Sequence, residues 1–166
     1  MSILGGGCGT TPAHIQALVG ACQGMPPLQV TEKNRSVVSS YTHAVVFEER
    51  PMIIGERINP TGKSRFKQAL REKDMEYIYK EALVQQEHGA HILDVNVGLP
   101  EIDEVEMMRK AVTGIQGITG LPLQIDTSDG AAMETAMRLY NGKPLINSVN
   151  GKQESMDTVF PLVAKY

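Results

Sequence analysis

The chain has 166 residues, 42% of them hydrophobic and 21% charged, which is typical of a soluble globular protein with one core. A net charge of −3 and a pI of about 5.8 provide no basic field for binding a nucleic-acid backbone. The apolar stretches are too short to cross a bilayer, no secretory signal is recognisable and only two cysteines occur, so we expect a cytoplasmic protein.

The first 22 residues predict a loop that leads into one short helix. A run of glycines precedes Thr11, whose side chain can cap a helix that begins at Pro12. The apolar residues that follow recur at helical spacing: Ile15, Leu18 and Val19. We expect this segment to form a loop-helix tail.

Residues 23–50 have a different pattern. They combine Pro26 and Pro27 with the stretch SVVSSYTHAVVF at 36–47, in which apolar and polar residues alternate. Such alternation predicts one or two strands and no helix. We interpret the segment as a connector between domains.

From Pro51 onward, a unit of apolar strand, polar turn and helix-length segment repeats. The predicted strands are 52–55, 91–95, 122–126 and 144–149, and the predicted helices are 73–88, 103–115 and 130–140. Asp129 can cap the last of these helices and Gly142 can end it. Apolar strands separated by helices must be parallel and covered on at least one face. The predicted fold class is α/β, and we favour an incomplete (βα) TIM-type barrel of about four βα units over a doubly wound sheet.

Polar residues gather where each predicted strand ends. They are Glu56, Arg57, Asn59 and Thr61 after the first strand, Asp94 and Asn96 at the second, Asp126, Thr127 and Ser128 at the third, and Asn147, Ser148 and Asn150 at the fourth. In a βα barrel these strand ends surround the active site. A single Asp or Asn at such a place can simply cap a helix or form a turn. Four polar strand ends in succession favour a binding site.

The residue types at this rim indicate the kind of ligand. Carboxylates and amides without Cys or His suit a neutral planar heterocycle better than a metal or a phosphate. A pterin is one such ring, because its 2-amino group and the adjacent ring N–H form a donor pair that one carboxylate can accept. A buried acid is costly without such a ligand, so the site would be specific for the ring.

Four motifs in order resemble the pterin-binding domain of cobalamin-dependent methionine synthases, of other methyltetrahydrofolate:corrinoid methyltransferases and, more distantly, of dihydropteroate synthases. They are GERINPTGKSRF (55–66), ILDVN (92–96), IDTSD (125–129) and LINSVNG (145–151). The opening LGGGCGTTPAHIQAL (4–18) is similar to the end of the homocysteine-binding zinc barrel and favours the methionine synthases. The resemblance implies a remnant of that barrel at 1–22, the connector at 23–50 and the N-terminal half of a pterin-binding barrel at 51–166.

The resemblance also implies roles for individual residues. Asn59, Asp94, Asn96, Asp126 and Asn147 match positions that bind the pterin, with Asn96 and Asp126 as the catalytic candidates. Glu56 and Arg57 are looser candidates for shaping the rim. In the family, the methyl group passes from N5 of methyltetrahydrofolate to cobalamin on another domain, and protonation of N5 improves the leaving group.

The zinc site of the family is only partly represented. Methionine synthases carry adjacent cysteines in the glycine-rich turn, whereas this chain has Gly7 and Cys8 there. Cys8 is therefore a remnant zinc ligand at most, and a small residue in a turn is the simpler interpretation, because tetrahedral zinc needs three or four ligands.

Taken together, we expect a methyltransferase fragment that binds methyltetrahydrofolate and works with a corrinoid-binding domain or protein. The alternative is a catalytically silent module that binds folate or assembles with a partner supplying the rest of the barrel, and a dihydropteroate synthase is a third, less favoured option. A complete βα barrel takes about 250 residues, whereas the barrel-like part of this chain offers only four strands. The first and fourth strands would then have unpaired edges, and the chain is expected to self-associate through them.

Overall fold

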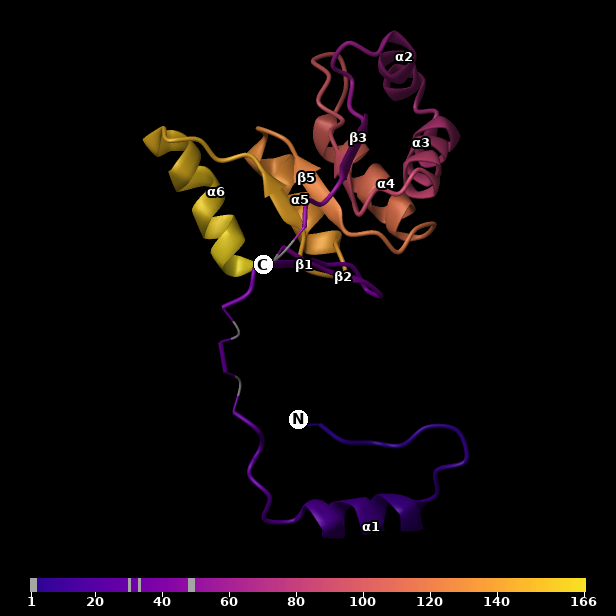
Figure 1. Ribbon diagram of the computed structural model, residues 1–166, viewed down its shortest axis with the longest axis vertical. Coiled ribbons are helices and arrows are strands. Elements are labelled where there is room, and N and C mark those ends of the chain that lie inside the picture. The colour runs from indigo at the N-terminus through magenta and orange to yellow at the C-terminus, as the bar shows by residue number, and fades with distance from the viewer. Residues whose placement is uncertain (1–2, 30, 33, 48–49) are drawn as a thin grey trace. The chain divides into compact units, whose positions relative to one another are not determined.

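The computed structural model describes residues 3–29, 31–32, 34–47 and 50–166 (Figure 1). These residues fall into two units, Met1–Asn34 and Arg35–Tyr166. The first is called unit 1 and the second unit 2.

Unit 1 contains the helix α1, Pro12–Cys22, which begins where the sequence predicted. Thr11 is its N-cap, and the Thr11 backbone N–H donates to Nδ1 of His14 over 3.1 Å. All residues of α1 are at least partly exposed. Apolar side chains of α1 and of the chain on either side of it line an open cavity of about 690 Å³, which includes Leu4, Val19 and Leu28.

Unit 2 is built on a parallel sheet in the order β3-β4-β5-β6, which confirms the predicted α/β class. The strands are β3 (Ile54–Ile58), β4 (Ile92–Val95), β5 (Leu123–Asp126) and β6 (Leu145–Asn147). The helices are α2 (Ser64–Glu72), α3 (Met75–Glu87), α4 (Glu104–Gln116), α5 (Gly130–Leu139) and α6 (Gln153–Lys165). The helices predicted from apolar spacing correspond to α3, α4 and α5, and α4 packs beside α5.

Three helices of unit 2 begin with an aspartate cap, and each cap follows from the local sequence. Asp74 accepts from the backbone N–H of Tyr77 over 3.1 Å, and Asp103 accepts from that of Glu106 over 3.0 Å. Asp129 accepts from two N–H groups at the start of α5, as predicted. These carboxylates satisfy amides that the helix itself cannot pair.

The two faces of the sheet differ because side chains alternate along a strand. Leu93, Val95, Leu123 and Ile125 are fully buried in the core that the helices cover. The side chains between them in sequence, such as Asp94 and Gln124, point to the opposite face. The hydrophobic pattern of β4 and β5 therefore leaves polar groups on the face that the helices do not cover.

The first strand lies at Ile54–Ile58, so it begins two residues and ends three residues later than predicted. The ladder pairs Ile54 with Ile92 and Ile58 with Val95, so β3 carries one extra residue in an irregularity between Gly55 and Ile58. The prediction that Glu56 and Arg57 follow the strand is wrong, because pairing with β4 continues past the apolar run. The backbone N–H of Arg57 donates to Oε1 of Gln85 over 2.8 Å, and Lys63 Nζ donates to the backbone carbonyl of Glu56 over 3.0 Å.

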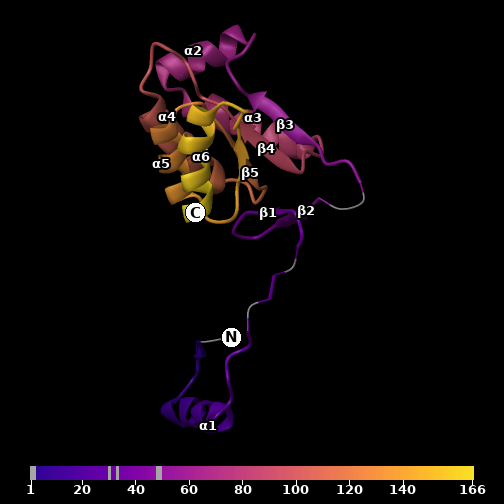
Figure 2. The same cartoon turned by 90° about the vertical axis from the view of Figure 1, so that its left-hand side faces the viewer.

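Residues 36–47 form an antiparallel hairpin, as their alternation predicted. It consists of β1 (Val37–Ser39) and β2 (Ala44–Val46) and lies at the lower end of unit 2 in both views (Figure 1 and Figure 2). Ser39 and Lys143 exchange backbone hydrogen bonds of 2.8 and 3.0 Å. This half of the predicted connector is thus part of unit 2, while its role between domains stays a prediction.

Gly142 lies against the backbone of this hairpin and does not end a helix. Helix α5 already ends at Leu139, three residues earlier than the predicted stop. Gly142 has a φ of +153°, and a Cβ built on it would collide with the carbonyl oxygen of Ser39. A glycine is needed here because two backbones approach closely.

Within the described part of the chain, no helix has both the length and the apolar character needed to cross a bilayer.

Tyr140 joins the hairpin to the sheet, which makes it a test of this packing. Its hydroxyl accepts from the Leu123 N–H over 3.0 Å and donates to the Ser39 carbonyl over 2.9 Å. Tyr140→Phe should lower the free energy of unfolding by about 1–3 kcal/mol, because a buried N–H loses its acceptor. Urea denaturation measures the change, and Tyr41→Phe, at a side chain 59% exposed, is the control with little expected effect. Equal stability of both variants would show that the Tyr140 bridge contributes nothing.

Candidate functional site

A small cavity opens on the polar face of the sheet. It has a volume of about 210 Å³ and is lined by Ile54, Glu56, Asp94, Gln124, Asp126 and Asn147. The register of the strands explains this gathering, because Asp94 lies opposite Gln124 and Asp126 lies opposite Asn147. Residues on neighbouring parallel strands that share a register also share a face. Four of the predicted site residues, Glu56, Asp94, Asp126 and Asn147, therefore meet in one cavity.

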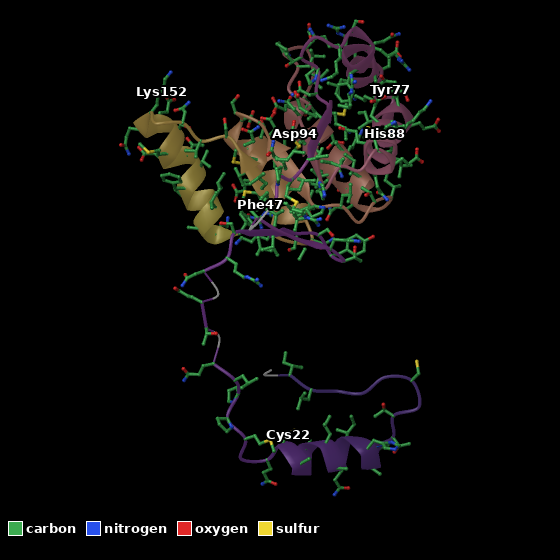
Figure 3. All side chains as sticks on the ribbon, in the orientation of Figure 1. Cys22, Phe47, Tyr77, His88, Asp94 and Lys152 are labelled. Carbon is green, nitrogen blue, oxygen red and sulfur yellow. The ribbon has the colours of Figure 1, made fainter. Side chains whose placement is uncertain are left out.

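Asp94 is the most deeply buried acid of the cavity, with 1% of its surface exposed (Figure 3). Its Oδ1 accepts a hydrogen bond from the side-chain amide of Gln124. Its Oδ2 is buried and has no hydrogen-bond partner among the described residues. A buried polar atom in this state is costly unless a ligand satisfies it.

Burial raises the pKa of Asp94 to about 6. The hydrogen bond from Gln124 lowers this pKa, the nearby carboxylates of Asp126 and Glu56 raise it, and the charge of Lys63 lowers it. The carboxyl group therefore titrates close to neutral pH, and shifted pKa values of this kind are common in functional sites.

Asp126 stands at the end of β5 and is held by a neighbouring loop. Asn96 donates from Nδ2 to Oδ2 of Asp126 over 2.9 Å. The Asn96 oxygen in turn accepts from the Gly98 N–H over 2.9 Å, which fixes the amide in this orientation. Asn96 therefore reaches the site through Asp126 and does not itself line the cavity.

Asn59 and Arg57, two further predicted site residues, do not line the small cavity. Asn59 is buried, donates from Nδ2 to Glu56 over 2.9 Å and accepts from the Thr61 N–H over 2.8 Å, so it orients Glu56. Arg57 lines a second, larger cavity of about 750 Å³ next to α2 and α3, where Tyr77 and His88 also lie (Figure 3). The structure thus separates Arg57 from the other predicted site residues.

Gln124 is the polar residue of the cavity that the sequence analysis did not single out. The signal was present, because Gln124 stands two residues before Asp126 in the strand LQID and a period of two puts both on one face. A polar residue between two buried apolar residues of a parallel strand is unusual. Its place could have been inferred from that period.

The cavity is acidic and rich in hydrogen-bond acceptors. Glu56, Asp94 and Asp126 face it together, and Asn147 adds an amide. Three carboxylates at one small cavity repel a phosphate and favour a ligand that presents N–H donors.

No group of three or more His, Cys, Asp and Glu side chains in the described ranges is arranged to hold a metal ion. Cys8 is exposed in unit 1, and its role as a remnant zinc ligand stays a prediction.

Comparison with known proteins identifies the family. The profile of the family called "Pterin binding enzyme" matches residues 55–166. The chain belongs to the pterin-binding enzymes. A methionine synthase of Mycobacterium tuberculosis is 32% identical over 175 aligned positions, which cover 100% of this chain and 14% of the relative. A methionine synthase of Mycobacterium leprae is 31% identical over 157 positions, with 90% and 13% covered.

These matches confirm the resemblance inferred from the motifs. The matched range contains β4 to β6, all of β3 except Ile54, and the five polar residues that line the cavity. The chain spans about 14% of the length of the first of these relatives.

The raised pKa of Asp94 predicts a pH-dependent stability. The folded pKa of about 6 exceeds the ordinary value of 3.8, so the stability that the protonated carboxyl contributes is present below pH 4 and is lost as the pH rises through 6. Asp94→Asn removes this loss. At pH 7.5 the variant should therefore unfold with a free energy about 3 kcal/mol above that of the wild type, and the difference should shrink toward pH 4.

Urea denaturation at several pH values measures this difference. Asp157→Asn, at an exposed aspartate of α6, is the matched control and should differ from the wild type by a small, constant amount. A constant difference for Asp94→Asn as well would contradict the raised pKa.

Proposed function

We propose that the cavity binds the pterin ring of methyltetrahydrofolate and that the chain is the folate-binding part of a methyltransferase similar to methionine synthase. The single observation that carries the proposal is the buried Oδ2 of Asp94, which lacks a partner within the described ranges. An acceptor kept in this state is explained by a ligand N–H that completes it. The family match of residues 55–166 supports a pterin as the source of that N–H.

The donor pattern of a pterin fits the groups at the cavity. The 2-amino group and the adjacent ring N–H are donors, and the Asp94 carboxylate, whose Oδ2 has no partner among the described residues, is an acceptor for them. The amide of Asn147 can donate or accept and so suits the mixed edge of the ring. Asn59 and Asn96 act one step away, by holding Glu56 and Asp126 in place.

For methyl transfer, the important atom of the ligand is N5. A proton on N5 makes the amine a better leaving group when its methyl group departs. We assign Asn96 and Asp126 to the hydrogen-bond network that stabilises this protonated form, because they are joined by a 2.9 Å hydrogen bond at the end of β5. A corrinoid on a partner domain or protein would supply the nucleophile that accepts the methyl group.

The remaining assignments follow from the same relatives. We propose that unit 2 is the first part of a βα barrel and that residues 1–22 are the end of a homocysteine-binding domain. The full methionine synthase activity, with its corrinoid and homocysteine, is proposed for the longer protein to which such a part belongs, since the aligned region is 14% of the relative.

Calorimetry with methyltetrahydrofolate tests the proposed ligand. Asp126→Asn should weaken binding about tenfold or more, because one charge-assisted hydrogen bond is lost and 1.4 kcal/mol corresponds to a factor of ten. The control Asp157→Asn should bind like the wild type. Undiminished binding by Asp126→Asn would remove Asp126 from the site, and a wild type that does not bind would refute the proposed function.

A second measurement separates an active site from a silent binding module. Methylcobalamin formation from methyltetrahydrofolate and reduced cobalamin should be detectable by absorbance with the wild type. Asn96→Ala should slow it at saturating folate, because the orientation of Asp126 is lost. Binding without any methyl transfer would favour the silent module.

A further inference from the structure

We propose that Gln124 is a positioning residue, which holds the Asp94 carboxylate so that one of its oxygens faces the ligand. The inference rests on the proposed function and adds a residue to the site that neither the motifs nor the family match assigns. It starts from the pairing of β4 with β5, in which Gln124 lies directly opposite Asp94. Both side chains line the same cavity.

The hydrogen bond between Gln124 and Asp94 gives the two carboxylate oxygens of Asp94 different roles. Gln124 donates from Nε2 to Oδ1 of Asp94, and Oδ2 is left buried and unbonded by any described residue. With Oδ1 held, rotation of the carboxylate about its last bond is restricted. Oδ2 is then the oxygen that a ligand N–H can reach.

The charge of Asp94 also determines which atom of the Gln124 amide faces it. An ionised Asp94 can only accept, so Nε2 and not Oε1 of Gln124 must face it. Oδ2 of Asp94 then stays the acceptor that is left for a ligand N–H.

Gln124 also favours the ionised form that the ligand requires. The charged groups that act on Asp94 are Asp126 of β5, Glu56 of β3 and Lys63 of the loop before α2. The two acids and burial raise the pKa of Asp94, while Gln124 and Lys63 lower it. A neutral donor opposite Asp94 thus stabilises the carboxylate without the desolvation cost of a second buried charge.

Gln124→Met tests the proposal, since methionine has a similar length and no donor. In the ligand-free protein, a ¹³C NMR titration should place the Asp94 midpoint near pH 6 for the wild type and about one unit higher for the variant, given the strength of a hydrogen bond to a charged group. Calorimetry should show roughly tenfold weaker binding of methyltetrahydrofolate at pH 7. Part of that loss should be recovered at pH 8.5, where Asp94 is ionised in both proteins.

Gln85→Met is the matched control. Gln85 is a buried amide, 7% exposed, whose hydrogen bonds go to the backbone N–H of Arg57 and the Glu81 carbonyl and not to Asp94. This variant should lose stability and keep the wild-type midpoint of Asp94, so a purely structural effect is distinguishable from positioning. Gln124→Glu, which keeps the polar character of the side chain but adds a negative charge, should raise the midpoint even further.

The outcomes separate the two proposals. An unchanged Asp94 midpoint together with unchanged binding in Gln124→Met would overturn the role of Gln124. A wild type that does not bind methyltetrahydrofolate would contradict the proposed function alone, because the titration of the ligand-free protein tests the contact between Gln124 and Asp94 separately.

Discussion

In the parallel pairing of β4, β5 and β6, Asp94 lies opposite Gln124 and Asp126 lies opposite Asn147. Because side chains alternate along a strand, this register sends Leu93, Val95 and Ile125 into the core and the polar residues to the other face. A shift of one residue would reverse both sets, burying carboxylates among the helices. The burial of apolar side chains under α4 and α5 therefore also determines where the acids of the site lie.

The aspartates of unit 2 illustrate how the same residue type serves stability or function. Asp74, Asp103 and Asp129 accept from backbone N–H groups at helix starts, where each carboxylate is satisfied locally. Asp94 has one oxygen bonded by a side chain and one without a partner in the described structure, and its pKa is raised to about 6. The first group stabilises helices, whereas Asp94 costs stability that a bound ligand would return.

Prediction from the sequence succeeded where the determining forces are local. The helices α3, α4 and α5 were recognisable from apolar spacing, and the Asp129 cap from its position before α5. It failed where a distant partner decides. Pairing with β4 extends β3 through Glu56 and Arg57, and the approach of Ser39, about one hundred residues away, explains Gly142. Arg57 was grouped with the rim residues, although its side chain lines another cavity.

The sequence by itself determined the α/β class, the order of strands and helices, the acidic and amide character of the strand ends, and the family to which they point. These properties follow from periodicity and from motifs within short stretches of chain. Only the tertiary structure decided which of those polar residues share a cavity, that Asn59 and Asn96 orient neighbours, and that Gln124 holds Asp94. The physical reason is that register, burial and hydrogen-bond partners arise between strands some thirty residues apart, and spacing along one strand does not specify them.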